Sequence, residues 1–368
     1  MQARAVPSPE VELFERVASG GHEQVVLCQH PETGLRAIIA IHSTQLGPAL
    51  GGTRFRSYPT DADALEDVLR LSRAMTYKAA VAGLPLGGGK AVIIGDPATV
   101  RTEGLMRTYA RFLESLGGRY LTAEDVGTTT ADMDLIRDET SYVTGVSEAR
   151  GGSGDPSPAT AVGVVHAMEA VAAHLWHSPS LAGRRVVVHG VGKVGGALAR
   201  RLADAGASVT VADVRAEAVA ELVASHGVRA VPTESAHREP CDVYAPCALG
   251  GVLNPATIPE LACIAVVGAA NNQLADATCA DRMLAAGITY APDYVVNGGG
   301  IINISEELAP RGYDRERAYA RLAEVGATTR AVLEAAAAGG ITTEAAADGL
   351  AESRLAAAGG HTIRTFRR

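Results

Sequence analysis

The sequence predicts an α/β protein made of two domains, and three observations lead to this fold class. The chain has 368 residues, which is more than a single hydrophobic core normally holds. Short apolar runs that are typical of buried strands alternate with segments of helical periodicity. The glycine-, serine- and proline-rich segment 151–158 is the clearest change of composition, and we interpret it as a domain boundary or hinge.

The first half is predicted to begin with a helix and a hairpin. The helix starts near Glu10, and the apolar strands 25–28 and 36–41 flank a turn that contains proline and glycine. We expect a loop to follow, in which the bare backbone at Gly51 and Gly52 faces an anion, although a simple turn also explains these two glycines.

A long helix is predicted next. Thr60 and Asp63 form a capping pattern, and apolar residues at three- and four-residue spacing continue to a helix end near Lys78. A lysine at such a place usually complements the helix dipole, so Lys78 alone is weak support for a site.

Lys90 follows three glycines at 87–89 and precedes the apolar run 91–94, which predicts a buried strand. Lys90 should therefore lie at the mouth of a strand, where a ligand could approach the backbone closely. The segment is not a nucleotide P-loop, because Leu84 stands where the first glycine is needed and Ala91 replaces the hydroxyl residue.

Asp125 is the next candidate residue. It follows the predicted strand 120–123, and the pair Thr129 and Asp132 predicts the cap of another helix. Asp125 thus lies between a strand end and a helix start, where ligands commonly bind in α/β proteins. A single aspartate at this place is also typical of a helix cap.

The second half predicts a Rossmann domain. The strand 185–189 leads into Gly190-Val191-Gly192-Lys193-Val194-Gly195, a helix follows, and the next strand, 208–213, ends in Asp213. The glycines would let a dinucleotide pyrophosphate reach the helix N-terminus, and Asp213 would accept hydrogen bonds from the adenosine ribose. A 2′-phosphate would be repelled by Asp213, so NAD is favoured over NADP, although Arg215 could soften this preference.

Three further strand ends, at 241–248, 264–272 and 288–293, carry small residues or amides at the edge where a cofactor would lie, although tight packing also explains them. A helix at 342–357 is expected to pack across the two domains.

Composition excludes several classes of protein. There are 33 basic and 41 acidic side chains, and the net charge of −8 argues against nucleic-acid and anionic-membrane partners. The five cysteines have no metal-binding spacing, so we predict no metal site. The N-terminus lacks the apolar core of a signal peptide, and the longest apolar run, 261–270, is too short to span a bilayer. A reducing cytoplasm is the expected location.

Over nearly its whole length the chain resembles the leucine/valine/phenylalanine dehydrogenase branch of the amino-acid dehydrogenases related to glutamate dehydrogenase. The motifs that carry the resemblance occur in family order: Gly51-Gly52-Thr53-Arg54, Met75-Thr76-Tyr77-Lys78, Gly87-Gly88-Gly89-Lys90, Ala123-Glu124-Asp125-Val126-Gly127, Asp155-Pro156-Ser157-Pro158, Gly190 to Gly195, Ala270-Asn271-Asn272 and Tyr290-Ala291-Pro292-Asp293-Tyr294.

The resemblance implies reversible oxidative deamination of an L-amino acid by NAD to a 2-oxo acid, ammonium and NADH. It also implies an N-terminal α/β substrate domain, residues 1–148, rejoined by the C-terminal residues 338–368. Residues 149–337 would form the Rossmann NAD-binding domain, with the active site in the interdomain cleft. A homo-oligomer is expected, and the sequence does not give its size.

The resemblance also assigns roles to residues. Lys78 matches the lysine that binds the substrate carboxylate, with help from the Gly51 and Gly52 backbone and Asn271. Lys90 matches the catalytic lysine, and Asp125 matches the general acid/base on the amino nitrogen. Physical chemistry supports these roles, because a cation in a dry cleft would stabilise negative charge that develops on the attacking water.

By similarity, the side-chain pocket comprises Leu50, Ala123, Ile301 and Ile304, all apolar, so the second carboxylate of glutamate would lack a partner. The two branched isoleucines favour valine or leucine, whereas the stretches 43–48 and 246–251 are more similar to the phenylalanine enzymes. The predicted cofactor-binding residues are Gly190, Val191, Gly192, Lys193, Val194, Gly195, Asp213, Ala248, Asn271 and Thr160.

Two other classes of protein remain possible from the sequence. A 2-hydroxy-acid dehydrogenase could use the same cofactor fold, but the ten histidines form no evident acid/base constellation. A non-catalytic NAD-binding sensor is the other alternative, and the presence of Lys78, Lys90, Asp125 and Asn271 together argues against it.

Overall fold

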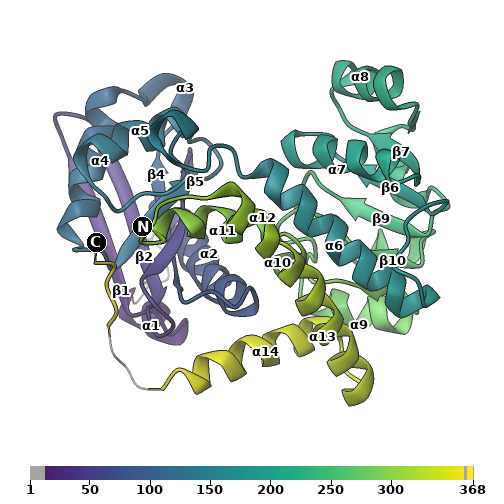
Figure 1. The fold of residues 1–368 in the computed structure, drawn as a ribbon. Coiled ribbons are helices and arrows are strands. Elements are labelled where there is room, and N and C mark those ends of the chain that lie inside the picture. The colour runs from purple at the N-terminus through teal and green to yellow at the C-terminus, as the bar shows by residue number, and fades with distance from the viewer. Residues whose placement is uncertain (1–12, 360–362, 368) are drawn as a thin grey trace, which may run out of the picture. The chain divides into compact units, whose positions relative to one another are not determined.

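The computed structural model describes residues 13–359 and 363–367 (Figure 1). The expected helix start at Glu10 lies outside these residues, and the first described helix is α1 (Leu13–Ser19). The described chain divides into two compact units. Unit 1 holds 13–76, 85–143 and 363–367, and unit 2 holds 77–84 and 144–359. The predicted α/β fold class is confirmed, while the limits predicted for the domains, 1–148, 149–337 and 338–368, stay a prediction.

Unit 1 is built on a mixed five-stranded sheet in the order β1-β2-β4-β3-β5. The hairpin pairs β1 with β2, β2 is antiparallel to β4, and β3 runs parallel to both β4 and β5. The strands are β1 (Gln24–His30), β2 (Leu35–Ser43), β3 (Ala49–Arg56), β4 (Gly87–Ile94) and β5 (Tyr120–Glu124).

The helices of unit 1 cover both faces of this sheet. Apolar residues of α2 (Asp61–Val81), which runs on into unit 2, pack on Ile38, Ala40 and Val92. The opposite face is covered by α4 (Glu103–Ser115), whose Tyr109 hydroxyl lies 2.6 Å from Thr53 Oγ1. The remaining helices are α3 (Pro97–Val100) and α5 (Thr130–Glu139).

Both predicted caps are present in unit 1. Thr60 and Asp63 exchange side-chain hydrogen bonds with each other's backbone N–H at the start of α2. Thr129 and Asp132 form the same reciprocal pattern before α5. Each pair satisfies backbone donors that a helix start would otherwise leave unpaired.

The expectation that the glycine segments are loops is wrong. Gly87–Gly89 begin β4, which therefore contains Lys90, and Gly51 and Gly52 lie inside β3. Packing explains these glycines. A Cβ at Gly87 would lie 2.0 Å from Ser43 O, and one at Gly88 would lie 2.0 Å from Thr76 N. The bare backbone lets neighbouring segments of the protein approach closely, which outweighs the low strand propensity of glycine.

Unit 2 contains a parallel six-stranded sheet in the order β11-β10-β9-β6-β7-β8, which is the doubly wound order of a Rossmann domain. Its switch point lies between β6 and β9, so the loops that follow these two strands form the expected ligand edge. The strands are β6 (Arg185–His189), β7 (Ser208–Ala212), β8 (Arg229–Ala230), β9 (Val243–Pro246), β10 (Ala265–Val266) and β11 (Thr289–Tyr290).

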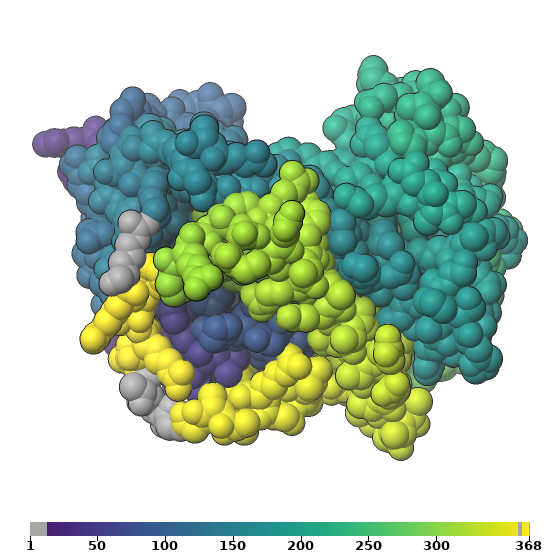
Figure 2. Space-filling view, viewed as in Figure 1, coloured from purple at the N-terminus to yellow at the C-terminus, as the bar shows by residue number. Residues whose placement is uncertain are grey.

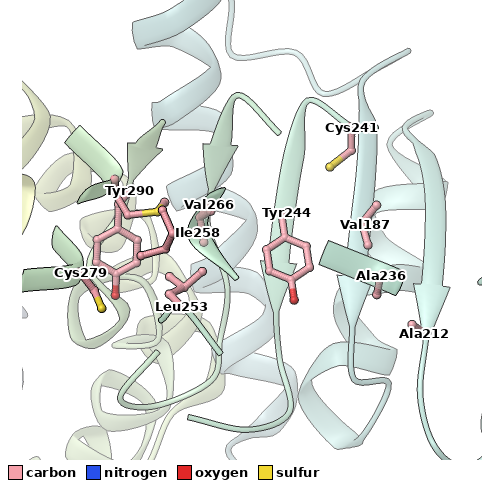
Figure 3. Packing of buried hydrophobic residues seen from close by; sticks show 11 residues of the cluster. Val187, Ala212, Ala236, Cys241, Tyr244, Leu253, Ile258, Val266, Cys279 and Tyr290 are labelled. Atoms are coloured by element: carbon pink, nitrogen blue, oxygen red, sulfur yellow. The ribbon is translucent and has the colours of Figure 1, made fainter. Parts of the chain in front are cut away.

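Neighbouring strands of unit 2 point large side chains into one apolar layer (Figure 3). Val187, Tyr244, Val266 and Tyr290 contribute from four strands, and α9 (Thr278–Ala285) covers them with Cys279 and Met283. Within this layer the Tyr244 hydroxyl lies 2.7 Å from His189 Nδ1, so the polar end of a buried ring has a partner.

Long helices complete unit 2. α6 (Ser157–Trp176) packs against α7 (Lys193–Asp204) and α13 (Ala323–Gly339). α13 leads into α14 (Thr343–Ala357), and the two helices form the yellow-green to yellow band in Figure 2. The other helices are α8 (Ala216–His226), α10 (Asp293–Val296), α11 (Gly299–Ser305) and α12 (Arg315–Arg321). None of the described helices is both long and apolar enough to span a bilayer.

The C-terminal helix α14 contacts the segment 77–84 of its own unit. Arg354 Nη1 donates to the carbonyl oxygens of Ala80 and Val81, and the Tyr77 hydroxyl donates to Glu352. Cationic donors at the last carbonyls of a helix stabilise its C-terminus, so α14 supports the end of α2 that carries Lys78.

Candidate active site

Unit 1 brings Lys90 and Asp125 together. Lys90 Nζ lies 2.8 Å from Asp125 Oδ2, and the two side chains are only 8% and 17% exposed. Lys90 comes from β4, whereas Asp125 follows β5. Lys90 therefore lies within β4 rather than at the mouth of a strand as expected, and the parallel strands β3, β4 and β5 bring its side chain to Asp125.

The electrostatics of this pair favour an ionised carboxylate. Burial alone would raise the pKa of Asp125, but the positive charges of Lys90 and Arg54 outweigh burial and hold the pKa below its ordinary value. Asp125 is therefore an anion at neutral pH and can accept a proton.

Arg54 is a charged residue of this cluster to which the sequence analysis gave no role. Its Nε lies 3.2 Å from Asp125 Oδ2, and its Nη1 lies 2.9 Å from Asp67 Oδ2 on α2. Arg54 follows Gly52 by two positions on β3, so both point to the same face of the sheet. That spacing, beside the glycine pair, is the signal that could have identified it.

Gly51 and Gly52 have packing roles beside this pair of residues. A Cβ at Gly52 would lie 2.8 Å from Asp125 Cβ, so only glycine leaves room for the carboxylate. A Cβ at Gly51 would lie 1.8 Å from Gly89 O. The Tyr120 hydroxyl donates to the Gly51 carbonyl at 2.6 Å and thereby holds the backbone of β3 in place.

Unit 2 brings Lys78 and Asn271 together. Lys78 Nζ donates to Asn271 Oδ1 at 3.4 Å, and Asn297 Nδ2 donates to the same oxygen at 2.9 Å. Because the oxygen accepts from two donors, the amide orientation of Asn271 is fixed and its NH₂ group is left to donate elsewhere. Asn297 was not predicted, although it stands directly before three glycines.

A second set of contacts holds the loop that carries Asn271. Asn297 Nδ2 also donates to Ala269 O at 3.1 Å. The buried Asp293 accepts from the backbone N–H of Gln273, and Gln273 Nε2 donates to the carbonyls of Gly268 and Ala270. The loop is therefore anchored on both sides of Asn271.

The predicted pocket residues are divided between the units. Leu50 and Ala123 are buried neighbours on β3 and β5 of unit 1. Ile301 and Ile304 are buried on α11 of unit 2, three positions apart and therefore on one helix face. All four side chains are apolar, as expected.

The glycine-rich loop after β6 has the shape that a dinucleotide needs. A Cβ at Gly190 would lie 2.6 Å from Ala248 Cβ, and one at Gly195 would lie 1.9 Å from Gly190 O. Gly192 is the residue before α7, and the atom nearest to a Cβ built there would be Arg215 Nη2, at 3.8 Å. Packing thus requires the first and third glycines, while the second leaves open backbone beside a helix N-terminus, which suits a pyrophosphate.

Asp213 lies beside this loop. Its carboxylate accepts from the backbone N–H groups of Val191 at 2.7 Å and Arg215 at 2.8 Å. Burial would raise the pKa of Asp213, but these hydrogen bonds and the Arg215 charge hold it below its ordinary value. Asp213 is therefore a fixed anion where the ribose is expected.

The remaining predicted cofactor residues occupy varied places. Lys193 Nζ lies 3.3 Å from Asp155 Oδ2, which links the glycine-rich loop to the segment before α6. Thr160 is buried on α6 and donates to Pro156 O. Ala248 lies against Gly190, and Val191 is buried. Cofactor contact by each of these residues stays a prediction.

Comparisons with known proteins identify the family. Residues 22–142 match the model of the "Glu/Leu/Phe/Val dehydrogenase, dimerisation domain", and residues 151–221 and 211–361 match that of "Glutamate/Leucine/Phenylalanine/Valine dehydrogenase". Leucine dehydrogenase of Geobacillus stearothermophilus is 50% identical over 345 residues, which cover 94% of each chain.

Two further relatives agree with this result. Valine dehydrogenase of Streptomyces virginiae is 53% identical over 339 residues, 91% of this chain and 94% of that protein. The crystal structure of L-tryptophan dehydrogenase from Nostoc punctiforme superposes with a TM-score of 0.81 at 42% identity, covering 94% of this chain and 99% of that one. The predicted amino-acid dehydrogenase with a dinucleotide cofactor is confirmed, and the chain belongs to the glutamate/leucine/phenylalanine/valine dehydrogenase family.

Proposed function

We propose that this enzyme catalyses the reversible, NAD-dependent oxidative deamination of an aliphatic L-amino acid, with valine and leucine as preferred substrates. The products are the 2-oxo acid, ammonium and NADH. The observation that carries the proposal is the buried pair of Lys90 and Asp125, with 2.8 Å between Nζ and Oδ2. A cation and an ionised carboxylate in one dry place supply the two groups that this chemistry needs.

In the proposed mechanism Asp125 takes a proton from the substrate ammonium, which makes the amine ready for oxidation. Bound NAD would supply the acceptor for the hydride from the α carbon. Lys90 then stabilises the negative charge that develops on oxygen when water attacks the substrate iminium. Asp125 returns its proton to the nitrogen of the carbinolamine and takes up the protons that the added oxygen loses as the C–N bond breaks and the carbonyl forms. The nitrogen leaves as ammonia, which is protonated to ammonium, and one further proton goes to solvent.

Lys78 and Asn271 are proposed to bind the substrate carboxylate. The Lys78 ammonium provides charge, and the NH₂ group of Asn271 provides a directed donor because its oxygen already accepts from Asn297. Two donors of this kind fix the position of the α carbon without taking part in proton transfer.

Side-chain preference is proposed to come from Leu50, Ala123, Ile301 and Ile304. These apolar residues leave a glutamate side-chain carboxylate without a partner. Relatives named as leucine and valine dehydrogenases are about half identical to this chain, which supports the aliphatic choice. An apolar pocket distinguishes one methylene by about 1–3 kcal/mol, so several substrates should be accepted.

NAD is the proposed cofactor because Asp213 is a fixed anion beside the glycine-rich loop. Its carboxylate can accept from ribose hydroxyls and would repel a 2′-phosphate.

A homo-oligomer is also proposed. The matched family model describes residues 22–142 as a dimerisation domain, and β1 is an edge strand whose Leu27 is 66% exposed. Light scattering on the purified enzyme tests this assembly. The five cysteines are unpaired, which supports a reducing cytoplasm as the proposed location.

NADH absorbance, measured while NAD and single L-amino acids are mixed with the enzyme, tests the activity. Turnover should be fastest with L-valine or L-leucine. Preference for L-phenylalanine would overturn the substrate assignment, turnover with 2-hydroxy acids alone would overturn the reaction, and binding of NAD without any turnover would indicate a sensor.

A further inference from the structure

We propose that Arg54 is a positioning residue that keeps Asp125 ionised and fixes which of its two carboxylate oxygens faces the reacting amine. The inference rests on the proposed role of Asp125 as the proton acceptor, and it extends that role to the residue that maintains it.

Arg54 and Lys90 contact the same oxygen of the Asp125 carboxylate. Its Nε lies 3.2 Å from Asp125 Oδ2, the same oxygen that Lys90 Nζ contacts at 2.8 Å. The carboxylate of Asp125 also accepts from the backbone N–H of Val126. Two cationic donors occupy the lone pairs of Oδ2, so Oδ1 keeps at least one lone pair that can accept a proton. A single cation could rotate with the carboxylate, whereas two cations from different strands hold the plane of the carboxylate.

Arg54 is itself held in place from α2. Its Nη1 lies 2.9 Å from Asp67 Oδ2, and Asp67 also accepts from the Tyr58 hydroxyl at 2.8 Å and from Arg70 at 3.2 Å. Asp67 therefore anchors one end of the guanidinium while Nε reaches Asp125. The planar, branched shape of arginine allows both contacts at once, which lysine cannot reproduce.

The charges around this group balance. The Arg54, Asp67 and Asp125 side chains are 15%, 14% and 17% exposed, and Lys90 is 8% exposed, so two cations and two anions share one poorly hydrated region. Burial opposes the charge on Arg54, but Asp125 and Asp67 outweigh it and raise the pKa of the guanidinium. Arg54 thus stays charged through the reaction.

The groups that face Asp125 come from four elements. They are Lys90 on β4, Arg54 on β3, Tyr120 on β5 and, through Arg54, Asp67 on α2. Of the two cations, Lys90 is proposed to act on the substrate. Arg54 is therefore the charge that can hold the carboxylate ionised while Lys90 serves the chemistry.

The test is the pH dependence of kcat/KM in Arg54→Gln and Arg54→Lys. Removing the charge should raise the pKa of Asp125, so the acid limb of the Arg54→Gln profile should move up by about 1 pH unit or more. Arg54→Lys should show much less of this shift, because it keeps the positive charge. Far-UV circular dichroism and thermal unfolding check that each variant is folded.

Arg36→Met is the matched control. Arg36 also links a strand of unit 1 to α2, through an ion pair with Asp61, but that pair is exposed and makes no contact with Asp125. Its pH profile should match the wild type. If Arg54→Gln lowers kcat/KM equally at every pH, or if Arg36→Met moves the acid limb as far, the proposed role of Arg54 is wrong.

A second measurement separates this inference from the proposed function. Carbon-13 NMR titration of labelled aspartate carboxyl groups, assigned with Asp125→Asn, reads the pKa of Asp125 without any turnover. The pKa should rise in Arg54→Gln even if the wild type proves inactive with every amino acid. An unchanged pKa in Arg54→Gln would overturn the inference even in a fully active enzyme.

Discussion

Unit 1 and unit 2 hold their candidate site residues by different means. In unit 1, Lys90, Asp125, Arg54 and Asp67 form a chain of opposite charges with little exposure to solvent. In unit 2, Asn271 is held by neutral amides and backbone groups, and Lys78 is the charged residue that joins them. Under the proposed function, the charges of unit 1 are grouped where protons move, and the amides of unit 2 are grouped where the substrate is oriented. The difference predicts that changes in unit 1 reduce kcat and alter its pH dependence, whereas changes in unit 2 raise KM.

The largest effect is expected from Lys90→Met. Loss of this cation should reduce kcat by about 10²–10⁴-fold, the range that a positioned acid/base group contributes. NAD affinity should stay near the wild-type value, because Lys90 belongs to unit 1 and the glycine-rich loop belongs to unit 2. Steady-state kinetics and cofactor titration measure the two quantities. A large loss of NAD affinity would contradict the assignment of these roles to separate units.

The next effect is expected from Asp213→Ala. NAD affinity should fall by about tenfold or more, as for a lost hydrogen bond to a charged group, and discrimination against NADP should weaken. Isothermal titration with both dinucleotides measures this change. Asp204→Ala, at the end of α7, provides a control outside the loop. Unchanged affinity and selectivity in Asp213→Ala would remove this residue from the cofactor site.

A smaller effect is expected from Asn297→Ala. The Asn271 amide would lose a donor to its oxygen and could rotate, so KM for the amino acid should rise by up to about tenfold with a smaller change in kcat. Ser225→Ala, the control, removes a hydroxyl that donates to Glu221 O within α8 of unit 2 and should leave KM unchanged. A loss in kcat with constant KM would place Asn297 among the groups that act in the chemical step.

The two units should also respond to pH in opposite directions between pH 5 and 8. In unit 1, burial lowers the pKa of His22 and lowers that of His42 to about 4, and the two rings lie 4.9 Å apart. The folded unit binds fewer protons than the unfolded chain, so its stability should fall as the pH drops below about 6.5.

In unit 2, burial raises the pKa of Asp293 and Glu307 and raises that of Glu344 to about 8. The folded unit binds more protons than the unfolded chain, so its stability should fall as the pH rises from about 4.5 to 8. Burial lowers the pKa of His189 in the same unit, and this histidine alone would make stability rise with pH. The three carboxyl groups act in the opposite direction.

This smallest effect is measured by comparing unfolding at pH 5 and pH 8. Trp176, the one tryptophan of the chain, reports on unit 2 by fluorescence, while circular dichroism follows both units. At pH 5 the circular dichroism change should begin before the fluorescence change. Glu344→Gln should flatten the alkaline loss in unit 2. Unit 2 unfolding first at pH 5 would contradict the comparison.

Sequence patterns singled out Lys90 and Asp125, and the structure brings the two side chains into contact. A lysine in a glycine-rich strand and an aspartate after a strand are visible as local motifs. The conformation of the glycine segments was not predictable, because the contacts that require Gly87, Gly88 and Gly51 come from residues distant in the sequence. Propensity alone therefore indicated loops.

Arg54 and Asn297 were missed for a related reason. Each contacts a partner that the fold brings near, namely Asp125 from 71 positions away and Asn271 from 26 positions away. The spacing of Arg54 from the glycine pair marks the residue, but a single sequence does not show which partner the fold brings to it. The doubly wound sheet, by contrast, was predictable, since every strand and helix of a βαβ unit is local in the chain.

The contact of α14 with the end of α2 matters for anyone who recombines members of this family. Arg354 and Glu352 reach the very turn that carries Lys78. A chimaera that exchanges only α14 and the residues after it would keep Lys78, Lys90 and Asp125. It would nevertheless change the contacts that support the end of α2. If Lys78 binds the substrate as proposed, exchange of this tail should change the affinity for the amino acid while Leu50, Ala123, Ile301 and Ile304 stay unchanged.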